Sequence, residues 1–226
     1  MKDANYILSL ESSENNCGVA ISLNDEIIAE VNYFGKNLHD KLMAELIKSL
    51  MKDMKISYDE LSAVAVSAGP GSFTGLRISA SIAKGICFGS DTKLIAVESL
   101  SAYAYSALET AKLVSAKNIS SIIKSNAGQV YLQNLSVEDL TVSEIYLLKI
   151  EEASNFLPEK TILVGSGANI ASGYIYLKDF ILPKVSFISK YAYRLFEDKM
   201  FTDAETYEPL YIQDFVPKTS TKSLSI

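Results

Sequence analysis

The stretch "SAGPGSFTGLRISASIAKGICFG", residues 67–89, joins a glycine-rich turn to a long segment that carries almost no charge. Directly before the turn, residues 61–69 ("LSAVAVSAG") show the uninterrupted apolar pattern of a buried strand. After it, residues 76–88 are apolar around most of a helix when they are placed at about 100° per residue. The order strand, glycine turn, helix is typical of an α/β protein, and from it we predict the fold class.

The glycine turn, which we call the glycine loop, does not match the two common phosphate-binding motifs. A P-loop needs a lysine and then a serine or threonine after its last glycine, but Leu76 and Arg77 follow Gly75. A dinucleotide fingerprint needs its third glycine one residue earlier. Two interpretations stay open: a helix N-terminus that holds an anion, and a tight turn that starts a buried helix. The glycine loop consists of Gly69, Pro70, Gly71, Ser72, Phe73, Thr74, Gly75 and Arg77.

The overall composition is that of a folded protein with a sizeable core and an acidic surface. The chain has 226 residues, of which 48% are hydrophobic and 21% are charged, and its net charge is -6. An acidic chain repels nucleic acid, so direct binding of nucleic acid is not expected. The two cysteines, Cys17 and Cys87, are expected to be reduced and buried. We find no signal peptide or membrane-spanning run, and we therefore expect a cytoplasmic protein with no membrane partner.

The hydrophobic pattern divides the chain into two related α/β halves. The first half begins with three strands and short turns, typical of an antiparallel meander, and a second, weaker series of strands follows. We place the boundary near residue 110, which gives an N-terminal half of residues 1–110 and a C-terminal half of residues 111–226. For the first half we predict strands at 6–12, 17–23, 26–34, 61–69 and 93–99, with helices at 38–54, at 74–88 and from Ser99 or Ser101 onward.

The second half is predicted to contain strands in "ISSIIKSN", "QVYLQNLS", "VSEIYLLKI" and "KTILVGSGA". A short helix is expected at residues 189–200 ("SKYAYRLFEDKM"), followed by an extended segment at 207–215 ("YEPLYIQDF"). The polar tail after it is expected to be frayed.

The two helices on either side of the buried strand carry more apolar surface than one sheet can cover. In the first helix the apolar side chains spread over roughly 220°, about twice the arc that packing on a sheet requires. The rest must be covered by the other half of the chain or by another protein, and in so short a chain we favour another protein. His39, the only histidine, is interpreted as a polar residue at a helix start rather than as a base or metal ligand. The predicted partner interface comprises Leu38, His39, Leu42, Met43, Leu46, Leu50, Ile78, Ile82 and Ile86.

Residue patterns for catalysis or metal binding are sparse. The sequence contains no His-x-x-x-His pair and no Gly-x-Ser-x-Gly nucleophile turn. We therefore expect no catalytic residue and no metal site. Glu11, at the end of the first predicted strand, is the best acidic candidate. Together with Ser12 it forms the pair that would hold a nucleotide or a metal if one binds.

Several motifs together resemble the TsaB (YeaZ) family of bacterial tRNA-modification proteins. They are, in order, "ILSLESS", "LHDKLMAELI", "SAGPGSFTGLRISASIAKGI", "AVESLSAYA", "GQVY", "VGSGA" and "EPLYIQ". The resemblance implies an actin-like, sugar-kinase-like (ASKHA) α/β fold of two related halves, of which the second is reduced. It also implies a dimer contact through the first two helices, which is the surface that the periodicity marks as too apolar.

The resemblance further implies a scaffold subunit and not an enzyme. In this family's complex the paralogous subunit TsaD carries the metal-binding histidines. That subunit transfers the threonylcarbamoyl group to the adenosine next to the anticodon of tRNAs that read codons starting with A. The resemblance implies pairing with TsaD, with the ATPase TsaE joining the complex, and pairing of the chain with itself. It implies no cofactor, and contact with tRNA only through the complex.

The sequence departs from the family pattern in two places. Glu11-Ser12-Ser13 stands where the family usually reads "DTS" or "DTA", and residues 124–131 ("KSNAGQVY") replace the charged "DARRGEVY". An alternative is therefore kept. In it the chain is an ATP-binding phosphotransferase or ATPase of the same fold that acts alone, with Glu11 and the glycine loop handling ATP and magnesium.

Overall fold

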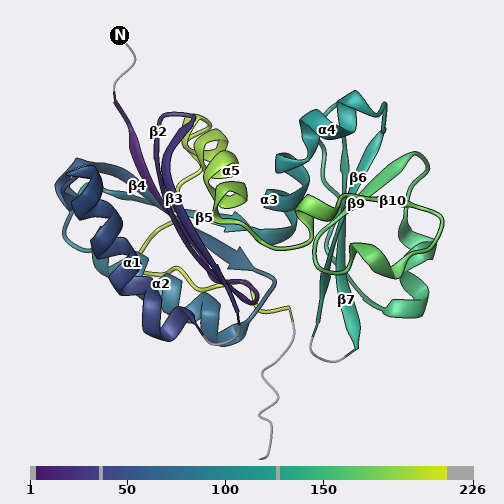
Figure 1. Cartoon of the computed structure of the whole chain (residues 1–226), viewed down its shortest axis with the longest axis horizontal. Coiled ribbons are helices and arrows are strands. Elements are labelled where there is room, and N and C mark those ends of the chain that lie inside the picture. Colours follow the sequence, from purple (N-terminus) through teal and green to yellow (C-terminus); the bar gives the residue numbers. More distant parts are fainter. Residues whose placement is uncertain (1–3, 36–37, 126–127, 213–226) are drawn as a thin grey trace, which may run out of the picture.

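The structure, a computed structural model, describes residues 4–35, 38–125 and 128–212. In this part of the chain two five-stranded sheets stand side by side with helices between them (Figure 1). Three expectations fall on residues outside the described ranges. They concern the frayed tail, the end of the extended segment at 207–215, and Asn126 and Ala127 in the replaced charged motif.

The first sheet begins with the predicted meander, which is confirmed. β1 pairs antiparallel with β2, and β2 pairs antiparallel with β3. β4 is parallel to β1, and β5 is parallel to β4, so the order across the sheet is β3-β2-β1-β4-β5. The strands are β1 (Tyr6–Glu11), β2 (Asn16–Leu23), β3 (Glu26–Phe34), β4 (Leu61–Gly69) and β5 (Lys93–Glu98).

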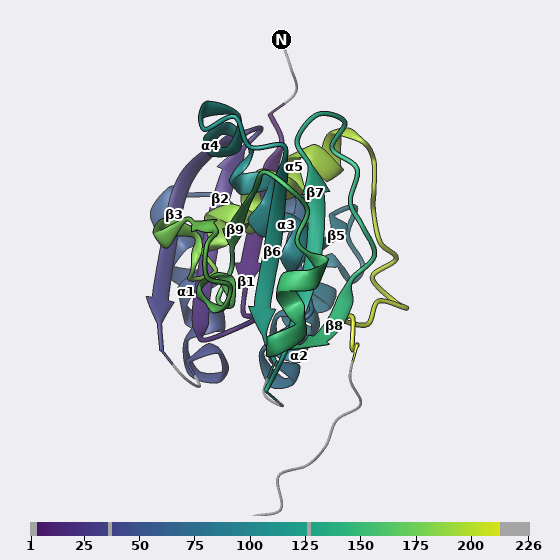
Figure 2. The same cartoon turned by 90° about the vertical axis from the view of Figure 1, so that its right-hand side faces the viewer.

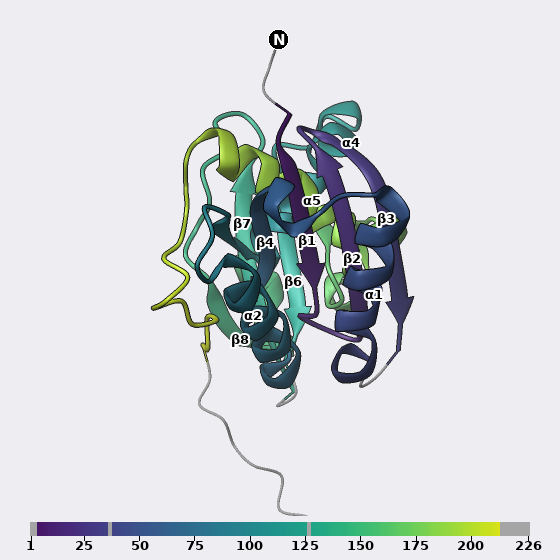
Figure 3. The same ribbon diagram turned by 90° about the vertical axis from the view of Figure 1, so that its left-hand side faces the viewer.

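Two helices cover the outer face of the first sheet, on the side away from the second sheet (Figure 3). α1 (His39–Met54) connects β3 to β4 by way of the short turn η1 (Tyr58–Glu60), and α2 (Phe73–Cys87) connects β4 to β5. Their inner side chains and the outward side chains of the sheet form one apolar cluster. Its buried members include Leu8, Val19, Met43, Ile47, Val64, Ala80 and Ala83.

The second sheet repeats the topology of the first with shorter elements. Its order is β8-β7-β6-β9-β10, with β6, β7 and β8 antiparallel and β9 and β10 added in parallel. The short helices η2 (Ile150–Phe156) and η3 (Ala168–Ile170) stand in the places of α1 and α2. Two related halves with a reduced second half are therefore confirmed. The strands are β6 (Asn118–Lys124), β7 (Gln129–Ser136), β8 (Tyr146–Lys149), β9 (Thr161–Val164) and β10 (Ile175–Tyr176).

The space between the sheets is filled by α3 (Ser99–Ser106) and α5 (Val185–Glu197), which pack on each other (Figure 2). α3 follows β5 but also contacts β6 and β7. α5 follows η4 (Lys178–Phe180) and contacts all five strands of the first sheet. Each half thus supplies a helix to the other. Two details differ from the sequence prediction: the helix after β5 breaks at Ala107 before α4 (Leu108–Leu113), and α5 begins four residues earlier than predicted.

The start of α5 is tied to the first sheet by two asparagines. Asn32 Oδ1 accepts hydrogen bonds from Val185 N (2.9 Å) and from Asn16 Nδ2 (3.1 Å). Asn16 Nδ2 also donates to Pro183 O. α5 has no side-chain cap from its own N-cap residue. Asn32 therefore supplies an acceptor that the first turn of the helix lacks.

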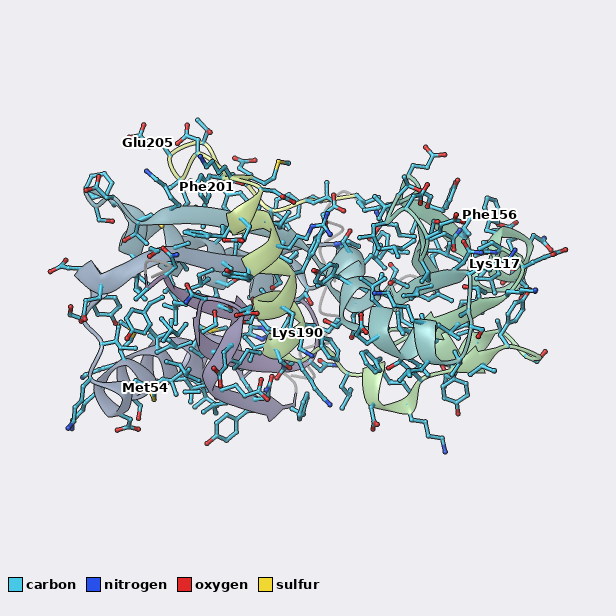
Figure 4. The ribbon with its side chains drawn as sticks, turned by 90° about the horizontal axis from the view of Figure 1, so that it is seen from above. Met54, Lys117, Phe156, Lys190, Phe201 and Glu205 are labelled. Carbon is cyan, nitrogen blue, oxygen red and sulfur yellow. The ribbon has the colours of Figure 1, made fainter. Side chains whose placement is uncertain are left out.

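After α5 the chain returns to the first half as an irregular segment, residues 202–212, which we call the strap. Thr202 N donates to Leu94 O of β5 (2.9 Å), and Tyr207 is buried in the outer apolar cluster. Phe201 and Glu205 lie on the opposite side of the first half from Met54 (Figure 4). The boundary near residue 110 stays a prediction: the two sheets lie on either side of it, but α5 and the strap pack on the first sheet.

Replacing Asn32 by alanine is expected to lower the free energy of unfolding by about 2 kcal/mol. The change leaves the N–H group of Val185 at the start of α5 without its acceptor, and it removes one of the two acceptors of Asn16 Nδ2. Urea unfolding measures the loss. Asn155→Ala, at an exposed position of η2, is the matched control and should stay within about 0.5 kcal/mol of the unsubstituted chain. Equal stability of the two variants would contradict the capping role of Asn32.

Candidate docking surface and glycine loop

The glycine loop lies directly against the turn that follows β1. Ser72 N donates to Ser13 O across this contact. A Cβ atom added to Gly75 would come 2.0 Å from Ser12 O, and one added to Gly71 would come 2.2 Å from Ser13 O. The glycines are therefore required by close backbone packing, in addition to the turn itself.

Two of the four N–H groups at the start of α2 that have no intrahelical acceptor, those of Ser72 and Gly75, are bonded to other atoms of the chain. Ser72 is the N-cap residue of α2, and its Oγ accepts from Gly75 N (3.3 Å). Ser72 N is bonded to Ser13 O, and Leu76 N is bonded to Ser72 O. These bonds favour the tight-turn interpretation of the glycine loop, because the helix start has fewer free amides for an anion than the sequence alone indicates. Gly69 and Pro70 are buried at the end of β4, whereas Gly71 and Thr74 are exposed.

Glu11 and Ser12, the candidates for holding a nucleotide or a metal, are buried and already bonded within the chain. Glu11 Oε1 accepts from Ser13 N and from Ser13 Oγ (2.6 Å). Ser12 Oγ donates to Gly75 O (2.9 Å) and lies 2.9 Å from Ser79 Oγ. Burial raises the pKa of the Glu11 carboxyl from 4.5 to about 7, which weakens it as a metal ligand at neutral pH. These two side chains therefore hold the glycine loop in place.

A second carboxyl group lies in the same turn and faces the second half. Glu14 Oε1 accepts a hydrogen bond from Tyr103 Oη of α3 (3.0 Å). Burial raises the pKa of Glu14, while hydrogen bonds from Ser166 and Tyr103 oppose the shift. A buried carboxyl group, Glu11, and a half-buried one, Glu14, thus lie close together near the contact between the two halves. A bound polyphosphate at this position would meet negative charge whenever they ionise.

The outer sides of α1 and α2 form the candidate docking surface. Six of the nine predicted interface residues are partly exposed there and remain candidates; they are Leu38, Leu42, Leu46, Ile78, Ile82 and Ile86. A hollow of about 480 Å³ lies along α2, lined by Phe73, Thr74, Arg77, Ile78, Ser81 and Ile82. The second sheet does not cover this surface, since it lies on the opposite side of the first sheet (Figures 1 and 3).

The other three predicted interface residues are buried within the chain, so their side chains do not form part of the exposed surface on α1 and α2. Met43 and Leu50 belong to the outer apolar cluster, and His39 is 5% exposed beneath the glycine loop. Among the described residues, His39 Nδ1 has no hydrogen-bond partner. α2 is also less buried than its composition predicts. Its small residues Ser79, Ala80 and Ala83 are buried, while Ser81 and Gly85 are exposed.

The remaining sequence expectations concern the cysteines, metal binding and membrane helices. Cys17 and Cys87 are both buried and unpaired, as predicted. In residues 4–35, 38–125 and 128–212 no group of three histidine, cysteine, aspartate or glutamate side chains lies close enough to share a metal ion. Across the same ranges no helix has the length and apolar character needed to cross a membrane.

Known proteins match this chain along most of its length. A family model described as "TsaD: tRNA N6-adenosine threonylcarbamoyltransferase" matches residues 28–189. The tRNA threonylcarbamoyladenosine biosynthesis protein TsaB of Buchnera aphidicola subsp. Schizaphis graminum is 32% identical, over 73% of this chain and 80% of that protein. The chain belongs to the TsaB (YeaZ) family. The Haemophilus influenzae TsaB is 27% identical over 93% of this chain and 94% of its own length.

A solved structure bears out the fold of this TsaB-family chain. YeaZ from Pseudomonas aeruginosa superposes with a TM-score of 0.79, covers 92% of this chain and all of its own, and is 20% identical. The actin-like, sugar-kinase-like fold predicted from the motifs is therefore confirmed. Family membership places the chain among the proteins of tRNA threonylcarbamoyladenosine biosynthesis.

Sequence reasoning missed the contacts that the strap makes with α2. Arg77 Nε donates to Tyr211 Oη (3.1 Å), and Lys84 Nζ donates to the carbonyl oxygens of Glu205 (3.0 Å) and Tyr207 (3.1 Å). The sequence does contain one indication of these contacts. Arg77 and Lys84 are seven residues apart, which puts both cations on one side of an otherwise apolar helix.

The raised pKa of Glu11 gives a testable dependence of stability on pH. The folded chain keeps the Glu11 proton up to about pH 7, whereas the unfolded chain releases it near 4.5, so this group's stabilising effect is lost as the pH rises between those values. Glu11→Gln removes the titration and keeps an acceptor oxygen. Relative to the unsubstituted chain, the free energy of unfolding of this variant should rise by about 3 kcal/mol between about pH 4.5 and pH 8. Urea unfolding at both pH values measures the difference, and parallel behaviour of the two proteins would contradict the assignment.

Proposed function

We propose that this chain is a non-catalytic scaffold subunit for threonylcarbamoyl transfer to the adenosine next to the anticodon of tRNAs that read codons starting with A. It pairs with the transferase subunit TsaD through the docking surface on α1 and α2, and TsaE joins the pair. Without TsaD, two copies of the chain pair through the same surface. The chain meets tRNA only through the complex, because its own net charge of -6 is unfavourable for phosphate binding.

The observation that carries the proposal is the half-buried apolar surface of α1 and α2. Six aliphatic side chains lie there on the side of the first sheet that no part of the second sheet covers. Charged side chains at Lys41, Glu45 and Lys48 are exposed beside it. An apolar centre beside charged residues is the usual composition of a protein–protein interface.

The match to the TsaD family model supports TsaD as the partner. The matched residues, 28–189, include both helices of the docking surface. A paralogous protein with the same two helices presents a similar surface. Two such surfaces can pack against each other about an approximate two-fold axis. The same geometry serves a pair of identical chains, which is why one surface is assigned to both kinds of dimer.

We assign a non-catalytic role because the candidate residues are already hydrogen-bonded within the chain. Glu11 and Ser12 bond to the turn and to the glycine loop, and Ser72 N and Gly75 N at the helix start are also engaged. A catalytic acid or base must be able to come within hydrogen-bonding distance of the substrate. These residues instead hold α2 in position for docking.

Ile82→Glu is expected to weaken binding to TsaD at least about 100-fold, because a charge would be placed in the apolar centre of the interface. Isothermal titration or surface plasmon resonance with purified TsaD measures the dissociation constant. Leu113→Glu is the matched control, since Leu113 is 85% exposed at the end of α4, and it should leave the affinity unchanged. Undiminished binding of the Ile82→Glu variant would overturn the proposal.

The alternative of an ATP-handling enzyme is tested by titrating the purified chain alone with ATP and magnesium. We expect no binding in the micromolar range, because Glu11 already accepts hydrogen bonds from Ser13 and its raised pKa weakens it as a magnesium ligand. Addition of TsaD to the same protein checks that it is competent to pair. A micromolar dissociation constant for ATP and magnesium, measured on the chain alone, would favour the phosphotransferase instead.

A further inference from the structure

The strap ends against the same helix that forms the docking surface. Its first residue, Thr202, is hydrogen-bonded to β5, and its Tyr207 is buried in the outer apolar cluster. Near its end Leu210 N donates to Ala68 O of β4 (2.8 Å). Figure 3 shows α2 with α1 on one side and the strap on the other. The outward side of α2 is the part that neither neighbour covers.

Three side chains join the strap to the first turns of α2. The Arg77 guanidinium lies 3.9 Å from the centre of the Phe73 ring and donates from Nε to Tyr211 Oη (3.1 Å). The rings of Phe73 and Tyr211 are 4.9 Å apart between centres. Such a cation–aromatic group fixes side chains that would otherwise be free to move on the surface.

A second attachment lies two turns further along α2. Lys84 Nζ donates to the carbonyl oxygens of Glu205 and Tyr207, so one ammonium group binds the strap backbone at two residues. Arg77 and Lys84 are seven residues apart and lie on the strap side of the helix. The strap is therefore attached to α2 at two points by residues of the same helix face.

The cation–aromatic group is also a wall of the docking surface. Phe73 and Arg77 line the hollow on α2 together with Ile78 and Ile82. Tyr211 does not line this hollow, but it bonds Arg77 and packs on Phe73. The shape of the hollow is thus set in part by a residue of the strap.

We propose that the strap is a positioning element of the docking surface, with Tyr211 and Lys84 as positioning residues. They hold α2 and the Phe73–Arg77 wall in the shape that an apolar side chain of the partner enters. Binding to a preformed hollow avoids the cost of ordering these groups when the partner arrives. This inference rests on the proposed function, because it assigns a role to residues beside the same surface.

The experiment compares dissociation constants for purified TsaD across variants of the full chain. Tyr211→Leu is expected to raise the dissociation constant about 10-fold, and Lys84→Met to raise it by a similar factor, because α2 loses an attachment in each. Tyr211→Phe keeps the ring packed against Phe73 and should recover most of the affinity. Tyr176→Leu, a partly exposed tyrosine of β10 in the second half, is the control and should have no effect.

Hydrogen exchange of the amides in residues 202–212 reports the state of the strap independently of binding. In Tyr211→Leu and Lys84→Met these amides should exchange faster, and the loss of protection should follow the loss of affinity. A strap that becomes unprotected while the affinity for TsaD stays unchanged would overturn the inference. In that case the Ile82→Glu variant still tests the docking surface. If this variant binds TsaD as tightly as the unsubstituted chain, the proposed function is overturned as well. If its binding is much weaker, the proposed function stands.

Discussion

The contact between the glycine loop and the turn after β1 is the constraint on which the rest of the first half depends. The backbone carbonyls of Ser12 and Ser13 come so close to Gly75 and Gly71 that no side chain fits between them. This contact sets where α2 begins. α2 in turn determines where the strap can attach and which aliphatic side chains face outward. A loop whose composition is reminiscent of phosphate binding thus acts here by bringing two backbone segments together.

The distribution of helices explains why the proposed docking surface lies on the first half of the chain. Each sheet has two faces that must be covered. The inner faces share α3 and α5, which cross between the halves, and the outer face of the second sheet is covered by short helices and loops around Leu132 and Leu163. Only the outer face of the first sheet carries two long helices, and those helices have apolar side chains on their own outer sides.

Much of this architecture can be predicted from the sequence because the periodicities are clear. The meander, α1 and α2 lie within one or two residues of their predicted bounds. Periodicity gives the width of an apolar arc but not its orientation, so His39, Met43 and Leu50 could not be told apart from Leu42 and Leu46. The strap could not be predicted at all, since Arg77 and Tyr211 are 134 positions apart and meet only in the folded chain. The early start of α5 is accompanied by a hydrogen bond to Asn32, which is 153 positions away in the sequence.

The identical strand order of the two sheets has a consequence for how such a chain can diverge. The segments between β3 and β4 and between β4 and β5 correspond to those between β8 and β9 and between β9 and β10. In one copy they contain long α-helices, and in the other they contain short 3-10 helices, yet the order and the direction of the paired strands are the same in both. These crossover positions are therefore sites where length can be gained or trimmed without disturbing strand pairing. A duplicated unit can in this way specialise one copy for recognition while the other is pared down to a structural support.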